Sequence, residues 1–242
     1  MKAATAIILA AERASQMNSA KPTALHEVAG RPIIDWMLAA FEGCVETPPV
    51  IVDGSQQMIA AHVSERARTA VQQEALGEAD ALRAARRTLE AAGNGLVFVI
   101  SGSYPLISAE LCKQLAEEAG NSGAAALAIF NEDEAGEDGA EEPILCDLFC
   151  APGNVWLAGL MCSSKEARLE DCFLQGVESC RITPALVENL HTGVAHYFPV
   201  TNRAMLAACE AEAQELLRDK HLENGVTMLD PNSVTLGADV EI

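Results

Sequence analysis

Three polar segments of the sequence, each directly after an apolar run, carry residue types that could hold a small ligand. They span residues 12–22, 72–80 and 102–105, and they supply carboxylates, an amide, hydroxyls and glycines. In open α/β sheets, ligands bind outside the carboxyl ends of the strands, near the switch in strand order. We therefore expect these segments to line one site, in which phosphate would be held by backbone N–H groups, a few cations or a metal.

Apolar runs that alternate with helical stretches would position this site. The expected strands are residues 5–11, 49–52, 69–72, 96–100 and 123–130, and the expected helices are residues 32–41, 55–66, 78–92 and 108–118, the last with Ser108 as N-cap. Such alternation predicts right-handed crossovers between parallel strands. The fold class is therefore α/β, a mostly parallel mixed sheet with helices on both faces.

The second half of the chain continues this pattern and then changes. We expect strands at residues 143–149, 155–162 and 194–200, and helices at residues 164–174, 184–190 and 203–220. Residues 226–236 alternate apolar and small side chains around an Asp-Pro turn, which is typical of the first rung of a β-solenoid. Because a solenoid needs several stacked rungs, either the native chain continues or this rung is a remnant.

The charge of the chain limits its partners. Its formal net charge is −19, from 35 acidic and 16 basic residues. Nucleic acid and anionic membranes both require a basic face, so neither is an expected partner. No apolar run reaches the roughly 18 to 20 residues of a membrane span, and residues 6–11 are too few for the core of a signal peptide. We therefore expect a cytoplasmic protein with free cysteines.

Two local clusters admit a metal but favour a simpler interpretation. Residues 132–142 contain seven acidic side chains in eleven positions, which predicts a solvated, mobile loop near residues 131–142 rather than a cation site. Cys146 and Cys150 are separated by three residues, with no His or second Cys pair nearby. Since common zinc knuckles use a two-residue spacing, core packing is the favoured interpretation of this pair.

Five sequence blocks, in a consistent order, resemble one known family. The chain resembles the N-terminal pyrophosphorylase domain of bacterial N-acetylglucosamine-1-phosphate uridyltransferases of the bifunctional type, whose first block reads LAAGxGTRMxSxxPKxLHxVAGxP. The blocks here are AIILAA at 6–11 with Met17, Ser19, Pro22, Leu25, His26 and Gly30, then QQEALG at 72–77, SGSYPLI at 101–107, VTNR at 200–203 and NGVTMLDP at 224–231. Residues 131–180 match poorly.

The resemblance implies a fold, an activity and a set of site residues. The fold would be the Rossmann-like nucleotide-diphospho-sugar transferase fold over residues 1–225, with a truncated start of a left-handed β-helix at residues 226–242. The family joins UTP to a sugar 1-phosphate with Mg²⁺ as cofactor and releases pyrophosphate. A uridine nucleotide or UDP-sugar would contact Leu9, Ala10, Ala11, Gln72 and Gly77 through its nucleotide, and Gly102 and Gly159 through its sugar.

Several residues that the family's chemistry requires are replaced in this sequence. The family Arg and Lys positions hold Gln16 and Thr23, and the positions of the two metal ligands hold Ser103 and Thr201, with Asn202 adjacent. Glu12 and Ala14 replace the loop glycines, Glu78 replaces a Thr, and Leu157 stands at the sugar-binding Asn. Loss of one such charge-stabilising group typically costs about 10²- to 10³-fold in rate. We therefore expect weak or no catalysis.

Alternatives to this interpretation remain open. The chain could be an active nucleotidyltransferase with atypical phosphate contacts, an enzyme of the same fold acting on another phosphorylated substrate, or a non-catalytic module that binds a nucleotide-sugar or a protein. Arg13 and Lys21 are present in the same loop as Gln16, but neither matches a catalytic position, and surface charges are the favoured interpretation. The oligomeric state is open, because the family trimerises largely through its β-helix.

Overall fold

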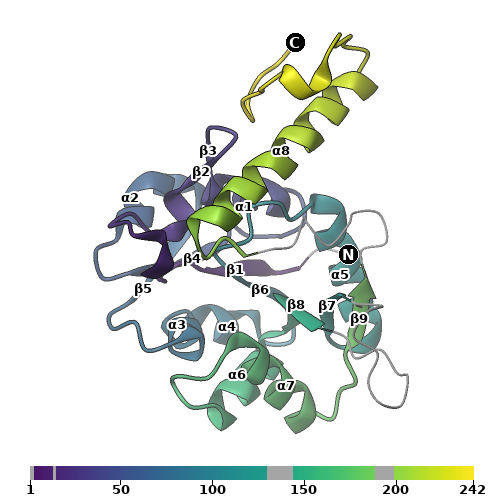
Figure 1. The fold of residues 1–242 in the computed structure, drawn as a ribbon. Coiled ribbons are helices and arrows are strands. Elements are labelled where there is room, and N and C mark those ends of the chain that lie inside the picture. Colours follow the sequence, from purple (N-terminus) through teal and green to yellow (C-terminus); the bar gives the residue numbers. More distant parts are fainter. Residues whose placement is uncertain (1–2, 13–14, 130–143, 189–198) are drawn as a thin grey trace, which may run out of the picture.

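A central seven-stranded sheet separates two layers of helices (Figure 1). The computed structural model describes residues 3–12, 15–129, 144–188 and 199–242. The strand order is β5-β4-β1-β6-β8-β7-β9. The strands are β1 (Thr5–Leu9), β4 (Val50–Gly54), β5 (Arg68–Gln72), β6 (Leu96–Ser101), β7 (Ala125–Ile129), β8 (Ile144–Pro152) and β9 (Ala185–Glu188), and a small separate sheet joins β2 (Glu27–Val28) to β3 (Arg31–Pro32).

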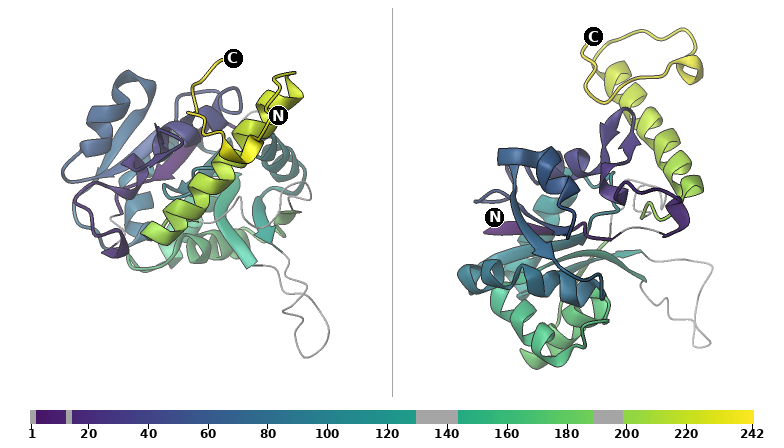
Figure 2. Two further views of the ribbon diagram at one scale, coloured as in Figure 1. Left: turned by 45° about the horizontal axis from the view of Figure 1, so that its top comes forward. Right: turned by 90° about the vertical axis from the view of Figure 1, so that its left-hand side faces the viewer.

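Each helical layer covers one face of the sheet (Figures 1 and 2). On one face lie α1 (Ile33–Phe41), α2 (Met58–Val63), α5 (Ala109–Ser122) and α8 (Arg203–Glu223), and on the other lie α3 (Glu78–Ala84), α4 (Arg86–Ala92), α6 (Gly153–Cys162) and α7 (Leu169–Ser179). Short 3-10 turns are η1 (Ser15–Met17), η2 (Thr23–Leu25), η3 (Ser64–Arg66) and η6 (Pro231–Ser233). The far end of α8 and the C-terminal residues project from the body, as both views of Figure 2 show.

Strands β1 and β6 form the centre of the sheet because both of their faces are buried. In β1, Ala6 and Ile8 pack into the core beneath α1 and α5, whereas Ile7 and Leu9 pack into the core against α3, α6 and α7. All six residues of β6 are buried in the same alternating way. Continuous apolar runs of this kind are typical of strands covered on both faces. The α/β class predicted from the sequence is therefore confirmed.

The sheet is mixed because one long strand runs against its neighbours. β1 pairs in parallel with β4 and β6, β4 with β5, and β7 with β9. β8 pairs antiparallel with both β6 and β7. The mostly parallel mixed sheet expected from the sequence is thus confirmed, and β8 brings its own side chains to the edge where β1 and β6 end.

The expected strand at residues 155–162 is wrong, because these residues lie in helix α6. The buried positions Val155, Trp156, Gly159 and Leu160 repeat at helical spacing, and Trp156 Nε1 donates a hydrogen bond to Val97 O at 3.2 Å. Trp156 thereby fills the core beneath the sheet. An apolar run of this length does not distinguish a buried strand from a buried helix by periodicity alone.

The expected helix at residues 184–190 is also wrong over its described part, which forms strand β9. β9 pairs in parallel with β7, and its side chains alternate, since Val187 is 2% exposed and Leu186 is 43% exposed. Period-two burial follows from the pleat of a strand with one covered face. Pairing with a neighbouring strand thus overrode the helical spacing seen in the sequence.

Two further helices differ from their expected bounds. The helix expected at residues 78–92 is interrupted at Ala85, a buried residue with φ −92° and ψ 10° that separates α3 from α4. Residues 164–168 precede α7 instead of forming its first turn, because the carbonyls of Lys165 and Ala167 accept hydrogen bonds from the first turn of α3. By contrast, Ser108 caps α5 as predicted, accepting from Leu111 N at 3.1 Å.

The C-terminal residues fold back onto α8 and the β2–β3 hairpin instead of forming a strand. The side chain of Gln214 on α8 makes two 2.8 Å hydrogen bonds with the backbone of Leu236, and Arg31 pairs with Asp239 at 2.7 Å. Whether residues 226–242 begin a β-helix stays a prediction, because one rung has nothing to stack on. The expected acidic loop at residues 131–142 and most of the expected strand at residues 194–200 lie outside the described residues.

All eight cysteines carry free thiols. Cys146 and Cys150 lie on β8 and are 6% and 0% exposed, so the prediction that they pack in the core is confirmed. Burial raises the pKa of the Cys146 thiol to about 12, which disfavours the thiolate that a metal would require. Among the helices of the described residues, none is both long and apolar enough to cross a membrane.

Candidate functional site

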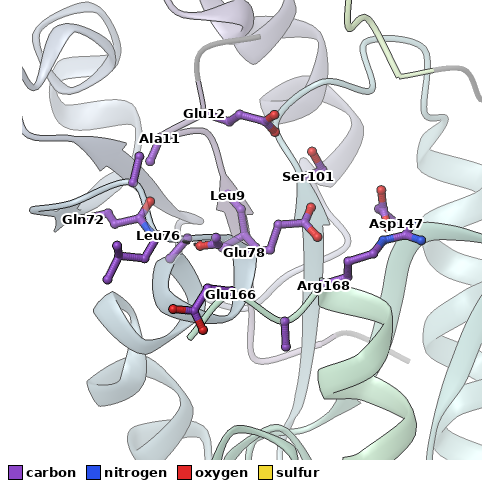
Figure 3. Close-up of a pocket in the computed structure, with 14 residues that line it drawn as sticks. Leu9, Ala11, Glu12, Gln72, Leu76, Glu78, Ser101, Asp147, Glu166 and Arg168 are labelled. Atoms are coloured by element: carbon purple, nitrogen blue, oxygen red, sulfur yellow. Dashed lines mark hydrogen bonds between the residues drawn. The ribbon is translucent and has the colours of Figure 1, made fainter. Parts of the chain in front are cut away.

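A cleft of about 420 Å³ opens at the carboxyl ends of β1, β5 and β6 (Figure 3). Each strand delivers one part of its wall, and the connection between α6 and α7 closes another. The cleft is lined by Leu9, Ala11, Glu12, Gln72, Ala75, Leu76, Gly77, Glu78, Ala81, Ser101, Asp147, Glu166, Ala167 and Arg168. The predicted convergence of residues 12–22, 72–80 and 102–105 at one edge of the sheet is therefore seen for members of each segment, the last through an adjoining hollow.

The end of β1 is held closely by its neighbours. Ala10 N donates to Val52 O at 2.9 Å, and Gly102 N donates to Leu9 O at 2.7 Å. A Cβ on Gly102 would lie 2.8 Å from the Cβ of Ala10, so this position requires glycine. Leu9 and Ala11 line the main cleft, whereas Ala10 lines the adjoining hollow. The backbone groups of Leu9 and Ala10 expected to bind a base are thus partly committed to the sheet.

Gln72 has a fixed orientation at the end of β5. The residue is 5% exposed, and its Nε2 donates to Gly77 O and to Asp80 Oδ2, each at 3.0 Å. These bonds commit the amide nitrogen to the protein and leave the amide oxygen as the group of Gln72 that can receive a ligand donor. Gln72 and Gly77, predicted to lie at one base site, are therefore in contact.

Gly77 is closely approached by the connection between α6 and α7, residues 164–168. A Cβ on Gly77, which has φ +145°, would lie 3.0 Å from Glu166 Cα and from Lys165 O. The 164–168 connection is fixed there by hydrogen bonds from Ala79 N to Ala167 O at 3.1 Å and from Asp80 N to Lys165 O at 3.2 Å. This connection forms one wall of the cleft.

The cleft is acidic. Among the residues that the structure describes, its charged lining residues are Arg168 and four acids, Glu12, Glu78, Asp147 and Glu166, so that one positive and four negative charges give a formal sum of −3. Figure 3 shows Arg168 extending towards Asp147 across one side of the cleft. A negative site opposes the entry of a triphosphate, which is itself multiply negative.

Two of these carboxylates are partly withdrawn from water. Burial raises the pKa of Glu78, although its Oε2 accepts a 2.8 Å hydrogen bond from Leu169 N at the start of α7. Burial likewise raises the pKa of Asp147, against the opposing effects of Arg168 and of the Tyr104 hydroxyl, which donates to Asp147 Oδ2 at 3.3 Å. Asp147 Oδ1 is buried and has no hydrogen-bond partner among the described residues.

An adjoining hollow of about 20 Å³ collects three of the four positions to which the sequence resemblance assigned phosphate or metal contacts. It shares Leu9, Glu12 and Ser101 with the main cleft and is completed by Ala10, Thr23, Ala24, Gly102, Ser103, Val200 and Thr201. Three predicted positions, Thr23, Ser103 and Thr201, are therefore brought together from distant parts of the chain. Gln16 is exposed on η1 and does not line either space.

The side chains of this hollow suit Mg²⁺ poorly. Ser103 Oγ lies 3.0 Å from Ser101 Oγ, and Thr201 Oγ1 donates to Met205 Sδ at 3.1 Å. Asn202 does not restore the missing ligand, because its Oδ1 caps α8 by accepting from Met205 N at 2.9 Å. Mg²⁺ prefers charged oxygen ligands, and Glu12 is the one carboxylate that lines the hollow in the described part of the chain. Within the described residues, no three His, Cys, Asp or Glu side chains gather where they could hold a metal.

Gly159, expected at the sugar, is not brought to the cleft. It lies inside α6, where a Cβ would be 1.9 Å from Cys172 O, so its role is to let α6 cross α7 closely. Leu157 lies on the same helix. The strand that does reach the cleft from this part of the chain is β8, through Asp147.

Sequence reasoning missed Asp147, Glu166, Arg168 and the wall that the last two form. All three fall within residues 131–180, where the resemblance is poor. A signal that could have located Glu166 and Arg168 is a helix start at Leu169 instead of residue 164, where Asp171 Oδ2 accepts a hydrogen bond from Arg168 N at 3.1 Å, one half of a capping box.

Comparison with known proteins agrees with this architecture. The chain is 26% identical over 269 residues to the bifunctional protein GlmU of Caldanaerobacter subterraneus, covering 100% of this chain and 58% of that protein. It is 30% identical over 266 residues to GlmU of Parvibaculum lavamentivorans, covering 98% of this chain and 58% of that protein. The chain thus spans less than two thirds of these relatives.

Solved structures with the same fold include two proteins whose names differ from those of the relatives above. One is the 4-diphosphocytidyl-2C-methyl-D-erythritol synthase of Anaerococcus prevotii, at TM-score 0.64 and 15% identity, covering 88% of this chain and 96% of that one. The other is the 2-C-methyl-D-erythritol 4-phosphate cytidylyltransferase of Thermus thermophilus, at TM-score 0.60 and 22% identity, covering 88% and 98%.

The family match covers nearly all of the α/β body, from β1 to the end of α8. Residues 6–224 match the family described as the MobA-like NTP transferase domain. With the mixed sheet and the cleft at its carboxyl edge, this match shows that the chain belongs to the MobA-like NTP transferase family.

Proposed function

We propose that this chain is a nucleotidyltransferase relative that binds the nucleoside part of a uridine nucleotide or UDP-sugar and performs little or no transfer. The observation that carries the proposal is the charge of the cleft, where four carboxylates accompany a single arginine among the described residues. Phosphoryl and nucleotidyl transfer depend on positioning and on neutralising phosphate charge. A cleft that is already negative before the ligand enters opposes both the positioning and the neutralisation of phosphate.

The residues left for a nucleoside are neutral. Leu9, Ala11 and Leu76 offer apolar surface, and the amide oxygen of Gln72 can accept from a base N–H. The ribose would lie towards Ser101, at the junction with the smaller hollow. Uracil and cytosine differ in the donors and acceptors of one edge, so an amide held in one orientation favours one of the two bases.

The phosphate side of the site supports the same proposal. Members of the NTP transferase family typically use Mg²⁺, but here hydroxyls of Thr23, Ser103 and Thr201 line the hollow with Glu12. Hydroxyls can hydrogen-bond a phosphate oxygen without neutralising its charge. These residues do not fit Mg²⁺, and we expect each added phosphate to weaken binding.

A charge series tests this proposal by isothermal titration calorimetry. Uridine, cytidine, UMP, UDP-N-acetylglucosamine and UTP are titrated separately, with and without Mg²⁺. We expect uridine or the UDP-sugar to bind at least as tightly as UTP, because the cleft repels additional phosphate charge. UTP binding more than tenfold tighter than uridine would contradict the proposal, and so would the absence of binding by every nucleoside at millimolar concentration.

A second candidate is an active transferase with an atypical phosphate contact. Arg168 is the observation in its favour, because among the described residues it is the one cation lining the main cleft. If Arg168 neutralised a phosphate, pyrophosphate release from UTP and a sugar 1-phosphate would be measurable. Replacement of Arg168 by Ala would then abolish that release, whereas replacement of the exposed Arg181, outside the cleft, would not.

A further inference from the structure

A second groove, of about 560 Å³, runs along strand β5 on the side of α3 and α4. Figure 1 shows β5 at one edge of the sheet. The groove is lined by Val50 of β4, the first four residues of β5 and the junction between α3 and α4. Every ionisable residue found in its described lining is an arginine, namely Arg68, Arg83, Arg86 and Arg87. The groove shares no lining residue with the acidic cleft.

Three of these four positive charges are not neutralised by a carboxylate of the described chain. Arg68 donates to the neutral oxygens of Thr5 and Pro48 at 3.2 and 3.1 Å, and Arg83 donates to the carbonyls of Leu160 and Ser163 at 2.8 and 2.6 Å. Arg87 is exposed and makes no ion pair with any described residue.

Arg86 differs from the other three, because it pairs with Glu90 at 2.8 Å. The groove therefore keeps about three uncompensated cations on a chain whose formal net charge is −19. The side chains of Arg68 and Arg83 are held in place by hydrogen bonds, so they lose little further conformational entropy when an anion binds.

Beside these arginines, the unpaired side of β5 offers backbone hydrogen-bonding groups to a ligand. Arg68 N donates to Pro49 O at 2.9 Å, so Arg68 faces β4, and so do Ala70 and Gln72 by alternation. Thr69 and Val71 therefore direct their N–H and C=O groups outward. β5 is the first strand in the sheet order, and among the described residues no strand pairs with its outer side. An edge of this kind is a template for another strand.

We propose that this groove binds an extended acidic segment of a partner protein, which adds a strand to β5 and places its carboxylates against the arginines. A peptide backbone supplies both donors and acceptors at the spacing that the outward groups of Thr69 and Val71 require. A phosphate supplies acceptors alone and would meet the outward carbonyls unfavourably. Nucleic acid would face the negative charge of the whole chain.

The test is fluorescence anisotropy with a labelled hexapeptide of alternating Glu and Val, and with a matched peptide of alternating Lys and Val. We expect binding of the acidic peptide alone, and weaker binding as salt rises. Arg87→Glu should weaken it at least tenfold, whereas Lys113→Glu, the same charge change on α5 outside the groove, should change it less than twofold.

Thr69→Pro tests the strand pairing itself. Proline removes the outward N–H of Thr69 but none of the bonds to β4, a position where edge strands accept proline. We expect at least tenfold weaker peptide binding. Hydrogen exchange on the unmodified protein gives an independent measure, because the peptide should slow exchange of the Thr69 and Val71 amides.

Two outcomes would overturn the proposal. If Arg87→Glu weakens binding while the Thr69 and Val71 amides exchange at unchanged rates, the groove is an anion site without strand pairing. If the acidic and basic peptides bind equally, the arginines do not select the ligand. Neither outcome bears on the nucleoside cleft, and Arg87→Glu should leave nucleoside binding unchanged.

Discussion

Replacing the two half-buried carboxylates of the cleft, in the double variant Glu78→Gln and Asp147→Asn, should convert it into a better nucleotide site. The formal charge of the lining residues changes from −3 to −1, since two of the four acids become neutral. Both amides keep an oxygen that can accept the existing hydrogen bonds from Leu169 N and Tyr104. The change therefore alters charge with little change of shape.

The expected gain follows from Coulomb's law. A unit phosphate charge about 8 Å from each carboxylate, at an effective dielectric constant of about 40 for an open cleft, is repelled by roughly 1 kcal/mol per pair. Removing two such pairs contributes about 2 kcal/mol for each phosphate charge, or roughly 30-fold in Kd. Uridine carries no phosphate and should bind the variant and the parent equally.

Calorimetric titration of UTP and uridine measures both effects. The matched control is Glu42→Gln with Glu178→Gln, which makes the same change in net charge at exposed positions outside the cleft. We expect UTP to bind the cleft variant at least tenfold more tightly than the control. Equal UTP affinities for the two variants would refute the reasoning, because the cleft acids would then not repel phosphate.

Three further predictions concern stability. Glu78 and Asp147 have folded-state pKa values raised by burial above their usual 4.5 and 3.8, so the folded state binds their protons more tightly. Ionising these two carboxyls lowers the free energy of unfolding; this loss is absent below the unfolded-state pKa and develops as pH rises through the folded-state pKa. The cleft variant should therefore have a higher Tm than the parent at pH 7 but not at pH 3. An equal gain in Tm at both pH values would contradict this linkage. Gly159→Ala should lower the free energy of unfolding, measured in urea, by about 1–3 kcal/mol, because the added Cβ would overlap Cys172 O. An unchanged urea midpoint would show that α6 and α7 separate without penalty. Asn202→Ala should cost about 1 kcal/mol through loss of the α8 cap without changing any response to Mg²⁺, whereas a lost Mg²⁺ response would instead identify Asn202 as a metal ligand.

The sequence predicts the sheet and one edge of the site well, for physical reasons. β1 and β6 are buried on both faces, so their continuous apolar runs identify them without tertiary information. Gln72 ends β5 and Gly77 follows it, and the carboxyl ends of parallel strands meet at one edge, so their place beside Leu9 in the lining of one cleft was predictable.

The opposite wall of the cleft was not predictable in the same way. Residues 155–162 of α6 were expected as a strand because Val155 and Trp156 lie in a short apolar run. The helix is identified only by its tertiary contacts, such as the hydrogen bond from Trp156 to Val97. Arg168 enters the cleft because residues 164–168 bond to the first turn of α3 rather than to their own helix. Such competition between local and tertiary hydrogen bonds is invisible in a single sequence.

Pyrophosphate release from UTP, a sugar 1-phosphate and Mg²⁺ tests the central claim most directly. The claim is that the replacements at Thr23, Ser103 and Thr201, together with the acidic cleft, remove the neutralisation of phosphate on which transfer depends. We predict turnover at least about 10³-fold below a usual kcat near 10 s⁻¹. Turnover within about tenfold of that usual value would contradict the account.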